Sequence, residues 1–254
     1  MVKKILSIVL WVVTAAALVV LFIFARENYL NTPLKAVNLI PSTDTGFVRK
    51  SVLREELKQI CGKSNIGTVN MIAVQNRLNT NPWIESNTSY IDMDGTLNVS
   101  FKEYEPAFRV FDRNGHSAYV TLEGMVVPAC RNYTPYVLIA SGNFRLDNDT
   151  SAFHLCDTLD RDHNLFNALH WFKAIERNPF IKNCVGQLYC NKHNEFELTV
   201  RGLEARVIVG DTCLAADKLR RLEIFMKQRI NNPETNTLKS INLSFKNQIV
   251  CTKR

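Results

Sequence analysis

The sequence predicts an α+β protein that starts with a membrane-spanning helix and continues into two further units. Three observations carry this prediction. Residues 5–25 contain no charged side chain, whereas the chain beyond them is polar enough to be soluble. Apolar residues with strand or helix spacing then follow in the order strand, helix, helix, strand, strand. From residue 107 onward, repeated short strands and only two longer helices predict a mixed β unit.

The first 25 residues have the length and the flanking charges of a single membrane anchor. The apolar run begins at Ile5 and ends at Ala25, and a helix of this length spans about 31 Å, which matches the hydrocarbon core of a bilayer. Lys3 and Lys4 precede the run, so the positive-inside rule keeps the first four residues in the cytoplasm and exports the rest. A cleaved signal peptide is the alternative, but it would have a shorter apolar region and a small residue where Ile23 stands.

The charge of the chain gives no indication of a nucleic-acid partner. The formal net charge is +7, and the basic residues are scattered. The densest basic group lies on a predicted helix with apolar residues at helical spacing, which is typical of a solvated helix face. Nucleic-acid binding would need aromatic residues interleaved with a basic stripe, which the sequence lacks. The group consists of Lys218, Arg220, Arg221, Lys227 and Arg229.

The cysteines predict thiols rather than a disulfide framework or a metal site. Their odd number cannot pair fully in a monomer, and no C-x-x-C motif occurs. A zinc site would need two close ligand pairs, and Cys184 with Cys190 is one loose pair. We therefore expect no metal and no cofactor. The seven cysteines are Cys61, Cys130, Cys156, Cys184, Cys190, Cys213 and Cys251.

The first exported unit is expected after a linker of residues 26–33. A strand is predicted over residues 34–40, and Ser51 is placed to cap a helix that Gly62 ends. Thr68 is placed to cap a second helix.

Two strands complete this unit, over residues 83–92 and 97–101. Asp94 and Gly95 between them are typical of a hairpin turn.

The second unit is expected to consist mainly of strands. Two helices are predicted over residues 165–177 and 214–230, and residues 129–163 show no clear pattern. The predicted strands cover residues 108–111, 118–122, 125–127, 185–190, 195–200, 205–209, 239–245 and 248–252.

The first exported unit resembles a POTRA domain, and its end resembles a particular protein family. Residues 81–84 (NPWI) stop the second helix, before the hairpin described above. Glu103, Pro106 and Ala107 then resemble the V-x-E-x-x-P-x-A ending that is typical of the FtsQ/DivIB cell-division proteins.

Three later segments resemble the same family in the same order. Residues 122–128 (LEGMVVP), residues 207–222 (VIVG followed by KL and L) and residues 241–250 (INLSFKNQIV) match its patterns. Each motif is weak alone, but together they follow the family along the whole exported chain. Asn242 and Ser244 depart from it, because the family often has Asp and Arg at these positions.

The resemblance implies a bitopic, non-enzymatic scaffold of the bacterial divisome. It implies a type II protein of the inner membrane at the division septum, with the lipid bilayer around residues 5–25. It also implies a cytoplasmic tail of residues 1–4, a POTRA domain over residues 34–106 and a β domain over residues 107–254. The implied partners are FtsB/DivIC-like and FtsL-like bitopic proteins and other divisome members.

The predicted partner site is the last strand, which would pair with a strand of a partner. No later strand in the sequence covers it, so we expect it at a sheet edge, after a turn at Lys246 and Asn247 and with one face in the core. A proline at Val250 or Thr252 would test the site if either residue turns its N–H outward. The candidate residues are Phe245, Lys246, Gln248, Ile249, Val250, Cys251 and Thr252.

Two other functions remain as alternatives. One is a membrane-tethered exported hydrolase, for which Asp160 and Asp162 beside His163 are the candidate acid–base residues, although no nucleophile is recognisable near them. The other is a different POTRA protein of envelope assembly, but such proteins usually carry several POTRA repeats.

Overall fold

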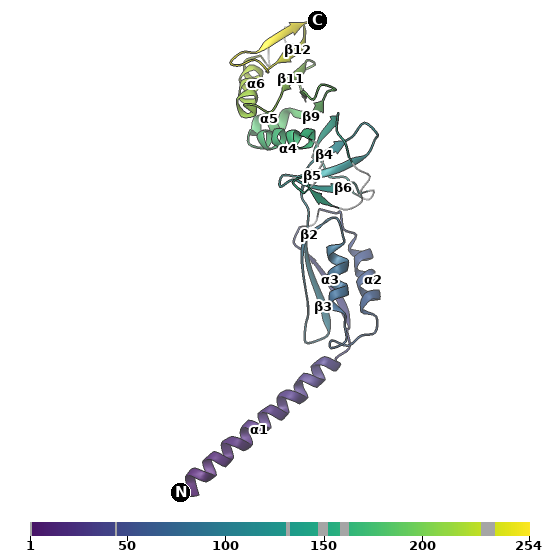
Figure 1. Cartoon of the computed structure of the whole chain (residues 1–254), viewed down its shortest axis with the longest axis vertical. Coiled ribbons are helices and arrows are strands. Elements are labelled where there is room, and N and C mark those ends of the chain that lie inside the picture. Colours follow the sequence, from purple (N-terminus) through teal and green to yellow (C-terminus); the bar gives the residue numbers. More distant parts are fainter. Residues whose placement is uncertain (1, 44, 131–132, 147–151, 158–162, 230–236) are drawn as a thin grey trace. The chain divides into compact units, whose positions relative to one another are not determined.

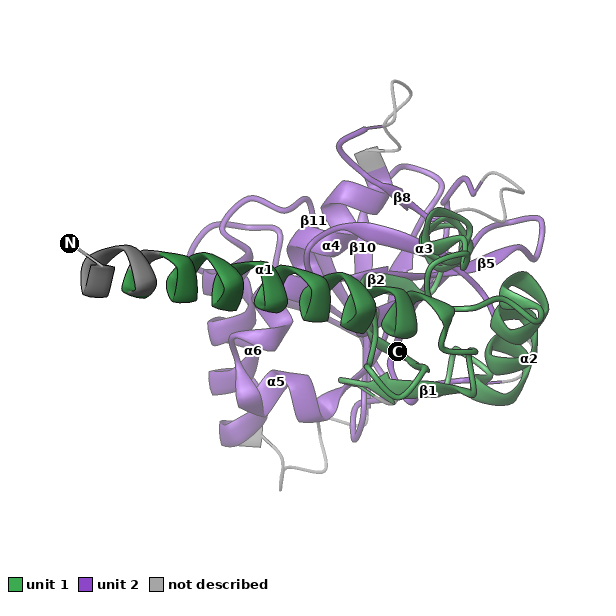
Figure 2. Cartoon of the chain, turned by 90° about the horizontal axis from the view of Figure 1, so that it is seen from below, with its two compact units in different colours: residues 1–103 green, residues 104–254 purple. Residues whose placement is uncertain are grey.

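The computed structural model describes residues 2–43, 45–130, 133–146, 152–157, 163–229 and 237–254. The chain divides into two compact units, which we call unit 1 (residues 1–103) and unit 2 (residues 104–254) (Figure 2). Each has its own buried core.

Unit 1 begins with one long apolar helix, α1 (Val2–Asn31). The described side chains from Val9 to Phe24 are exposed, and within the described residues α1 is the one helix long and apolar enough to cross a membrane. The helix also includes residues 26–31, which the sequence suggested as part of a linker. No proline or glycine interrupts the helix before Pro33, so the backbone continues helically past the apolar run.

The rest of unit 1 is a three-stranded sheet with two helices, in the expected order of elements. The strands are β1 (Ala36–Pro41), β2 (Ile84–Ile91) and β3 (Thr96–Glu103), and the helices are α2 (Lys50–Cys61) and α3 (Met71–Asn79). β3 is central, parallel to β1 and antiparallel to β2. Figure 1 shows α2 and α3 lying along the strands. Leu57 and Leu78 of the helices share one core with Leu97, Val99 and Phe101 of β3.

The two helices begin at residues other than the expected caps. The N-cap of α2 is Arg49, and Ser51 lies inside the helix. The N-cap of α3 is Asn70, whose Oδ1 accepts from the N–H of Ala73 at 3.0 Å. The hydroxyl of Thr68 is used earlier, since it accepts from the N–H of Asn65 at 3.0 Å and closes the preceding turn.

Unit 2 is built on a ten-stranded sheet. Its strand order is β13-β12-β11-β10-β9-β7-β4-β5-β6-β8. The helices are α4 (His163–Glu176), α5 (Pro179–Cys184) and α6 (Ala215–Arg229). The strands are β4 (Pro106–Phe111), β5 (Ser117–Thr121), β6 (Met125–Pro128), β7 (Leu138–Gly142), β8 (Phe153–His154), β9 (Val185–Cys190), β10 (Phe196–Val200), β11 (Arg206–Gly210), β12 (Leu238–Asn242) and β13 (Val250–Lys253).

Three of these elements were not predicted. β7 and β8 lie in the segment without a clear pattern, and α5 is a single short helix that Asn178 caps, with Pro179 at its start. β7 is nonetheless central, since it is parallel to both β4 and β9. It contains only five residues and two of them are Ser141 and Gly142, so its sequence carries little strand signal.

The helices of unit 2 pack on the sheet around one core. Trp171 and Phe172 of α4 are almost completely buried, and the ring of Phe172 stacks on Phe108 of β4 with centroids 4.0 Å apart. Leu219 and Leu222 of α6 bury in the same core. α4 and α6 therefore share one core with the sheet. α6 lies beside the end of the sheet that carries β11 and β12 (Figure 1).

Candidate partner-binding edge

β13 lies at one end of the ten-stranded sheet and pairs only with β12 among the described strands. The pairing is antiparallel, with Val250 opposite Asn242 and Thr252 opposite Ser240. The prediction that the last strand occupies a sheet edge is confirmed. An edge strand presents backbone N–H and C=O groups on the side without a neighbour.

The hydrogen bonds of β12 fix which of its residues face β13. The N–H of Leu243, just after β12, donates to the carbonyl of Ile208 in β11 at 2.9 Å. Because backbone groups alternate in direction along a strand, the N–H groups of Asn242 and Ser240 point the other way, toward β13. Their partners Val250 and Thr252 therefore form the hydrogen-bonded pairs of this ladder.

A second hydrogen bond shows which N–H groups of β13 point toward β12. The N–H of Arg254 donates to the carbonyl of Thr237 at 2.9 Å, on the β12 side. The N–H groups of Thr252 and Val250 point the same way, by the same alternation. The backbone of Lys253 faces the opposite side, away from β12. Neither residue that the sequence suggested for a proline test turns its N–H outward.

The side chains of β13 are all exposed, so the expectation that one face of this strand lies in the core is wrong. Cys251 stands opposite the completely buried Ile241 and is itself exposed. β12 is the last strand that contributes side chains to the core, and β13 lies outside the core. Only Ile249, just before the strand, is half-buried against the core.

A single arginine of α6 holds the turn that leads into β13. The guanidinium of Arg221 donates to the carbonyls of Leu243 at 3.1 Å, Phe245 at 2.9 Å and Gln248 at 2.7 Å. Its Nε donates to Asp217 at 2.9 Å. We call this set of contacts the Arg221 clasp. The guanidinium provides hydrogen-bond donors to three carbonyls that lie outside the strand pairing, and its bond to Asp217 orients it toward them.

A lysine one turn earlier in α6 holds the loop after β11. The ammonium of Lys218 donates to the carbonyl of Asp211 at 2.8 Å and to its carboxylate at 2.7 Å. This hydrogen bond holds the pKa of Asp211 below its usual value. The hydrogen bond from Arg220 and the charge of Arg221 likewise lower the pKa of Asp217.

The basic group of α6 is therefore not a uniform solvated face, as its sequence suggested. The side chains of Lys218 and Arg221 are only 5% and 11% exposed, whereas that of Arg220 is 67% exposed. The side chain of Arg229 lies outside the described part of the chain.

The remaining candidate residues form the tip of the same hairpin. Lys246 and Asn247 form the expected turn, and Asn247 has a positive φ of 58°. Phe245, Lys246 and Gln248 are exposed. The structure thus places all seven predicted partner-binding residues on one continuous hairpin, and all of them except the half-buried Ile249 are exposed. Asn242 contributes to its shape, because its Oδ1 accepts from the N–H of Ser244 at 2.9 Å.

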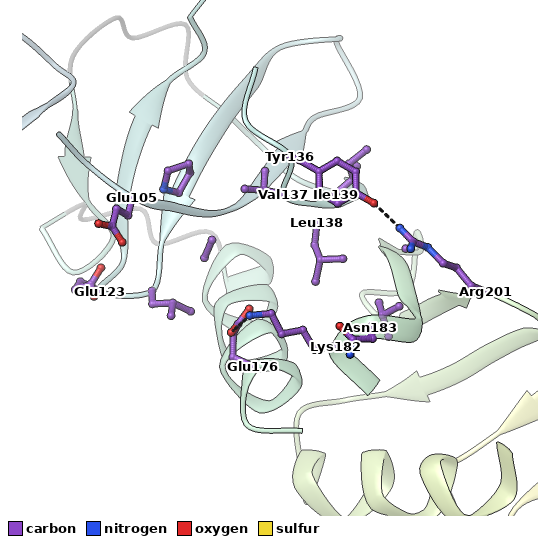
Figure 3. Close-up of a pocket in the computed structure, with 15 residues that line it drawn as sticks. Glu105, Glu123, Tyr136, Val137, Leu138, Ile139, Glu176, Lys182, Asn183 and Arg201 are labelled. Carbon is purple, nitrogen blue, oxygen red and sulfur yellow. Dashed lines mark hydrogen bonds and ion pairs between the residues drawn. The ribbon is translucent and has the colours of Figure 1, made fainter. Parts of the chain in front are cut away.

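A pocket of about 730 Å³ also lies in unit 2 and includes none of these residues. Figure 3 shows Glu105 and Glu123 on one side of it and Arg201, which donates to the hydroxyl of Tyr136 at 2.6 Å, on the other. Glu176 and Lys182 pair between them at 2.7 Å. The described lining residues include no serine, cysteine or histidine.

The other candidate chemistry does not gather at one place in the described residues. No group of three or more His, Cys, Asp and Glu side chains there could hold a metal ion. Asp160 and Asp162 lie outside the described residues, as does the side chain of His163. All seven cysteines are described, and the structure places no disulfide between them.

Fold and site together define an α+β protein with an exposed sheet edge near its C-terminus and an N-terminal apolar helix that is compatible with membrane anchoring. A sequence model described as FtsQ/DivIB, C-terminal related, matches residues 105–252, which is more than half of the chain. The chain belongs to this FtsQ/DivIB-related family, a family of non-catalytic cell-division proteins. No curated protein matches the chain. Membership points to a role in cell division, and the matched region contains both the Arg221 clasp and most of β13.

Proposed function

We propose that this protein is a bitopic scaffold of the divisome and that β13 is its docking edge. In this proposal α1 anchors the chain in the inner membrane at the septum, with residues 1–4 in the cytoplasm. Residues 34–106 form a POTRA domain and residues 107–254 the family's β domain. A strand from an FtsB/DivIC-like or FtsL-like partner pairs with β13 and extends the ten-stranded sheet.

The observation that carries the proposal is the combination of an edge position with a fixed conformation. β13 is bound to β12 on one side and held at its turn by the Arg221 clasp, while its other side has no strand beside it among the described residues. A partner strand thus meets a backbone that is already extended. Less ordering is needed on binding, which favours affinity.

The charges in the turn before β13 and at the end of β13 limit which strands can pair with it. Lys246 and Lys253 are exposed, and Arg254 forms an ion pair with Glu204 at 2.8 Å. Charged residues on an edge strand disfavour indiscriminate pairing with other edges. The backbone of β13 then provides affinity, and its exposed side chains select the partner.

The proposal is tested by removing one outward-facing N–H. Lys253→Pro deletes this donor without removing a bond to β12, whereas Lys253→Ala keeps the donor and removes the lysine side chain beyond Cβ, including its charge. Binding of the exported part of an FtsB/DivIC-like partner to the full chain in nanodiscs should weaken by up to about tenfold for Lys253→Pro, the equivalent of one backbone hydrogen bond. It should change less for Lys253→Ala.

Thr252→Pro provides the internal comparison, because its N–H faces β12. It should loosen the hairpin itself, which amide exchange of residues 238–253 would detect. If Lys253→Pro remains folded and binds the partner as tightly as the unaltered chain, β13 is not the docking edge.

A further inference from the structure

The end of α1 is fastened to the body of unit 1 by backbone hydrogen bonds. The N–H of Gly67 donates to the carbonyl of Leu30 at 2.9 Å, and that of Ile66 donates to the carbonyl of Thr32 at 3.0 Å. The N–H of Lys35 then donates to the carbonyl of Gly95 at 2.8 Å. The α2–α3 loop therefore lies against the end of α1, and the β2–β3 turn lies against the residues that follow it.

Both contacts depend on glycine. A Cβ at Gly67 would lie 3.1 Å from the Cβ of Leu30, and a Cβ at Gly95 would lie 2.3 Å from the carbonyl oxygen of Pro33. Gly95 also has a positive φ of 87°. These two positions allow the chain that leaves α1 to approach the loops closely, so α1 and the body of unit 1 meet at a packed junction.

The junction lies close to the end of the apolar run. Leu30 follows Ala25 by five residues, a rise of about 8 Å along the helix. The polar headgroup layer on each side of a bilayer is about 5–8 Å thick. With residues 5–25 in the hydrocarbon core, the junction therefore lies at the outer boundary of the headgroups, and any tilt of α1 brings one side of it closer.

The two most exposed large apolar side chains of unit 1 outside α1 lie at this same end. Met93, in the β2–β3 turn, is 87% exposed, and Ile72, in the first turn of α3, is 74% exposed. Met93 is two residues from Gly95, and Ile72 is five residues from Gly67. Neither side chain contributes to the core of unit 1.

The segments that meet at the junction, residues 26–35, 62–67 and 91–96, carry as many cations as anions. Interleaved charges of both signs complement a zwitterionic headgroup, which offers a phosphate to a cation and an ammonium to a carboxylate. They do not form the cationic cluster that anionic lipid surfaces attract. The cations are Arg26, Lys35 and Lys63, and the anions are Glu27, Asp92 and Asp94.

We propose that Ile72, Met93, Lys35 and Lys63 form a basal surface that rests on the zwitterionic headgroup layer around α1. Met93 and Ile72 enter the interface, and the lysines reach lipid phosphates. This contact would fix the tilt of unit 1 relative to the membrane surface. The inference rests on the proposed membrane anchoring by α1.

The contact can be measured by tryptophan quenching in the full chain. The chain is reconstituted in phosphatidylcholine vesicles whose acyl chains carry bromine near either the headgroup or the tail end. Trp83 and Trp171 also emit, so the part of the emission that Trp11→Phe removes reports on α1 itself. In a Trp11→Phe background, Trp83 and Trp171 give a constant emission that is subtracted. The emission that Met93→Trp, and separately Ile72→Trp, adds to it should be blue-shifted and quenched most strongly by bromine near the headgroup.

Thr80→Trp in the same background is the matched control. Thr80 is exposed at the C-terminal end of α3, away from the α2–α3 loop, so its tryptophan should remain unquenched. Adding anionic lipid should change the quenching little. If Trp11 is quenched while the tryptophans at positions 72 and 93 behave like the control, the basal surface is wrong and the anchor stands. If Trp11 also escapes quenching, the anchoring proposal fails as well.

Discussion

Removing the Arg221 clasp should open the terminal hairpin and leave the rest of unit 2 intact. Arg221→Ala removes three hydrogen bonds from a guanidinium to the carbonyls of Leu243, Phe245 and Gln248. A bond from a charged donor contributes about 1.5–3 kcal/mol, but water can replace the guanidinium at the two exposed carbonyls. We therefore expect a loss of about 2 kcal/mol, which is about a 30-fold increase in the open population.

Amide hydrogen exchange followed by mass spectrometry measures this opening locally. In the full chain, peptides from residues 243–253 should exchange about 30-fold faster in Arg221→Ala, while peptides from β9 and β10 keep their rates. The free energy of global unfolding should change less, because Arg221 contributes only its aliphatic stem to packing.

Arg220→Ala is the matched control for this experiment. Arg220 is the preceding residue, donates to the same Asp217 at 3.1 Å and donates to no carbonyl of the described hairpin. Its loss should leave the exchange of residues 243–253 unchanged. Equal exchange in both variants, or unchanged exchange in Arg221→Ala, would refute the clasp.

Three further outcomes follow from the contacts described above. Asp211→Asn should lower the melting temperature by about 3 °C at pH 7, corresponding to about 1 kcal/mol, since the buried Lys218 ammonium loses its carboxylate partner. Folding lowers the pKa of Asp211, so the stability that its carboxylate contributes is present above pH 4. A calorimetric pH series should therefore show the difference in melting temperature between the two proteins shrinking as the pH falls below that value. Thiol labelling of the native protein, located by mass spectrometry, should modify the exposed Cys213 quickly and Cys61 only on unfolding, because Cys61 is buried and burial raises its thiol pKa; equal rates would contradict this accessibility. A fragment of residues 34–106 should fold alone with a cooperative melt by circular dichroism, because the core of unit 1 uses only residues within that range, and an unfolded fragment would contradict the proposed domain boundary.

The predictable parts of the fold are those with local signals. Alternating apolar residues predicted β3, whose Leu97, Val99 and Phe101 are buried on one face. The Asp94–Gly95 pair predicted the turn before β3, and in the structure Gly95 has the positive φ that such a turn requires. The edge position of β13 followed from its place in the chain.

The unpredicted parts depend on contacts between residues far apart in sequence. Arg221 and Gln248 are 27 residues apart, and nothing in the helical pattern of α6 distinguishes Arg221 from the solvated Arg220. β7 is a strand because β4 and β9 flank it, not because its own residues favour strands. Glu103 was noticed as part of a motif, and only the structure shows it buried, with Oε2 accepting from the N–H of Phe47 at 3.0 Å.

The clasp holds the turn that leads into β13, and the proposed docking edge is β13 itself, so their effects on partner binding should be coupled. In the proposed function, Arg221 would act on binding only by holding β13 in place, whereas Lys253→Pro would remove a contact to the partner itself. Once the edge is lost, opening the hairpin has little binding energy left to remove. Binding measurements on Arg221→Ala, Lys253→Pro and the double variant should therefore give a combined loss smaller than the sum of the two single losses. Additive losses would mean that Arg221 contributes to partner binding by a route that does not pass through β13.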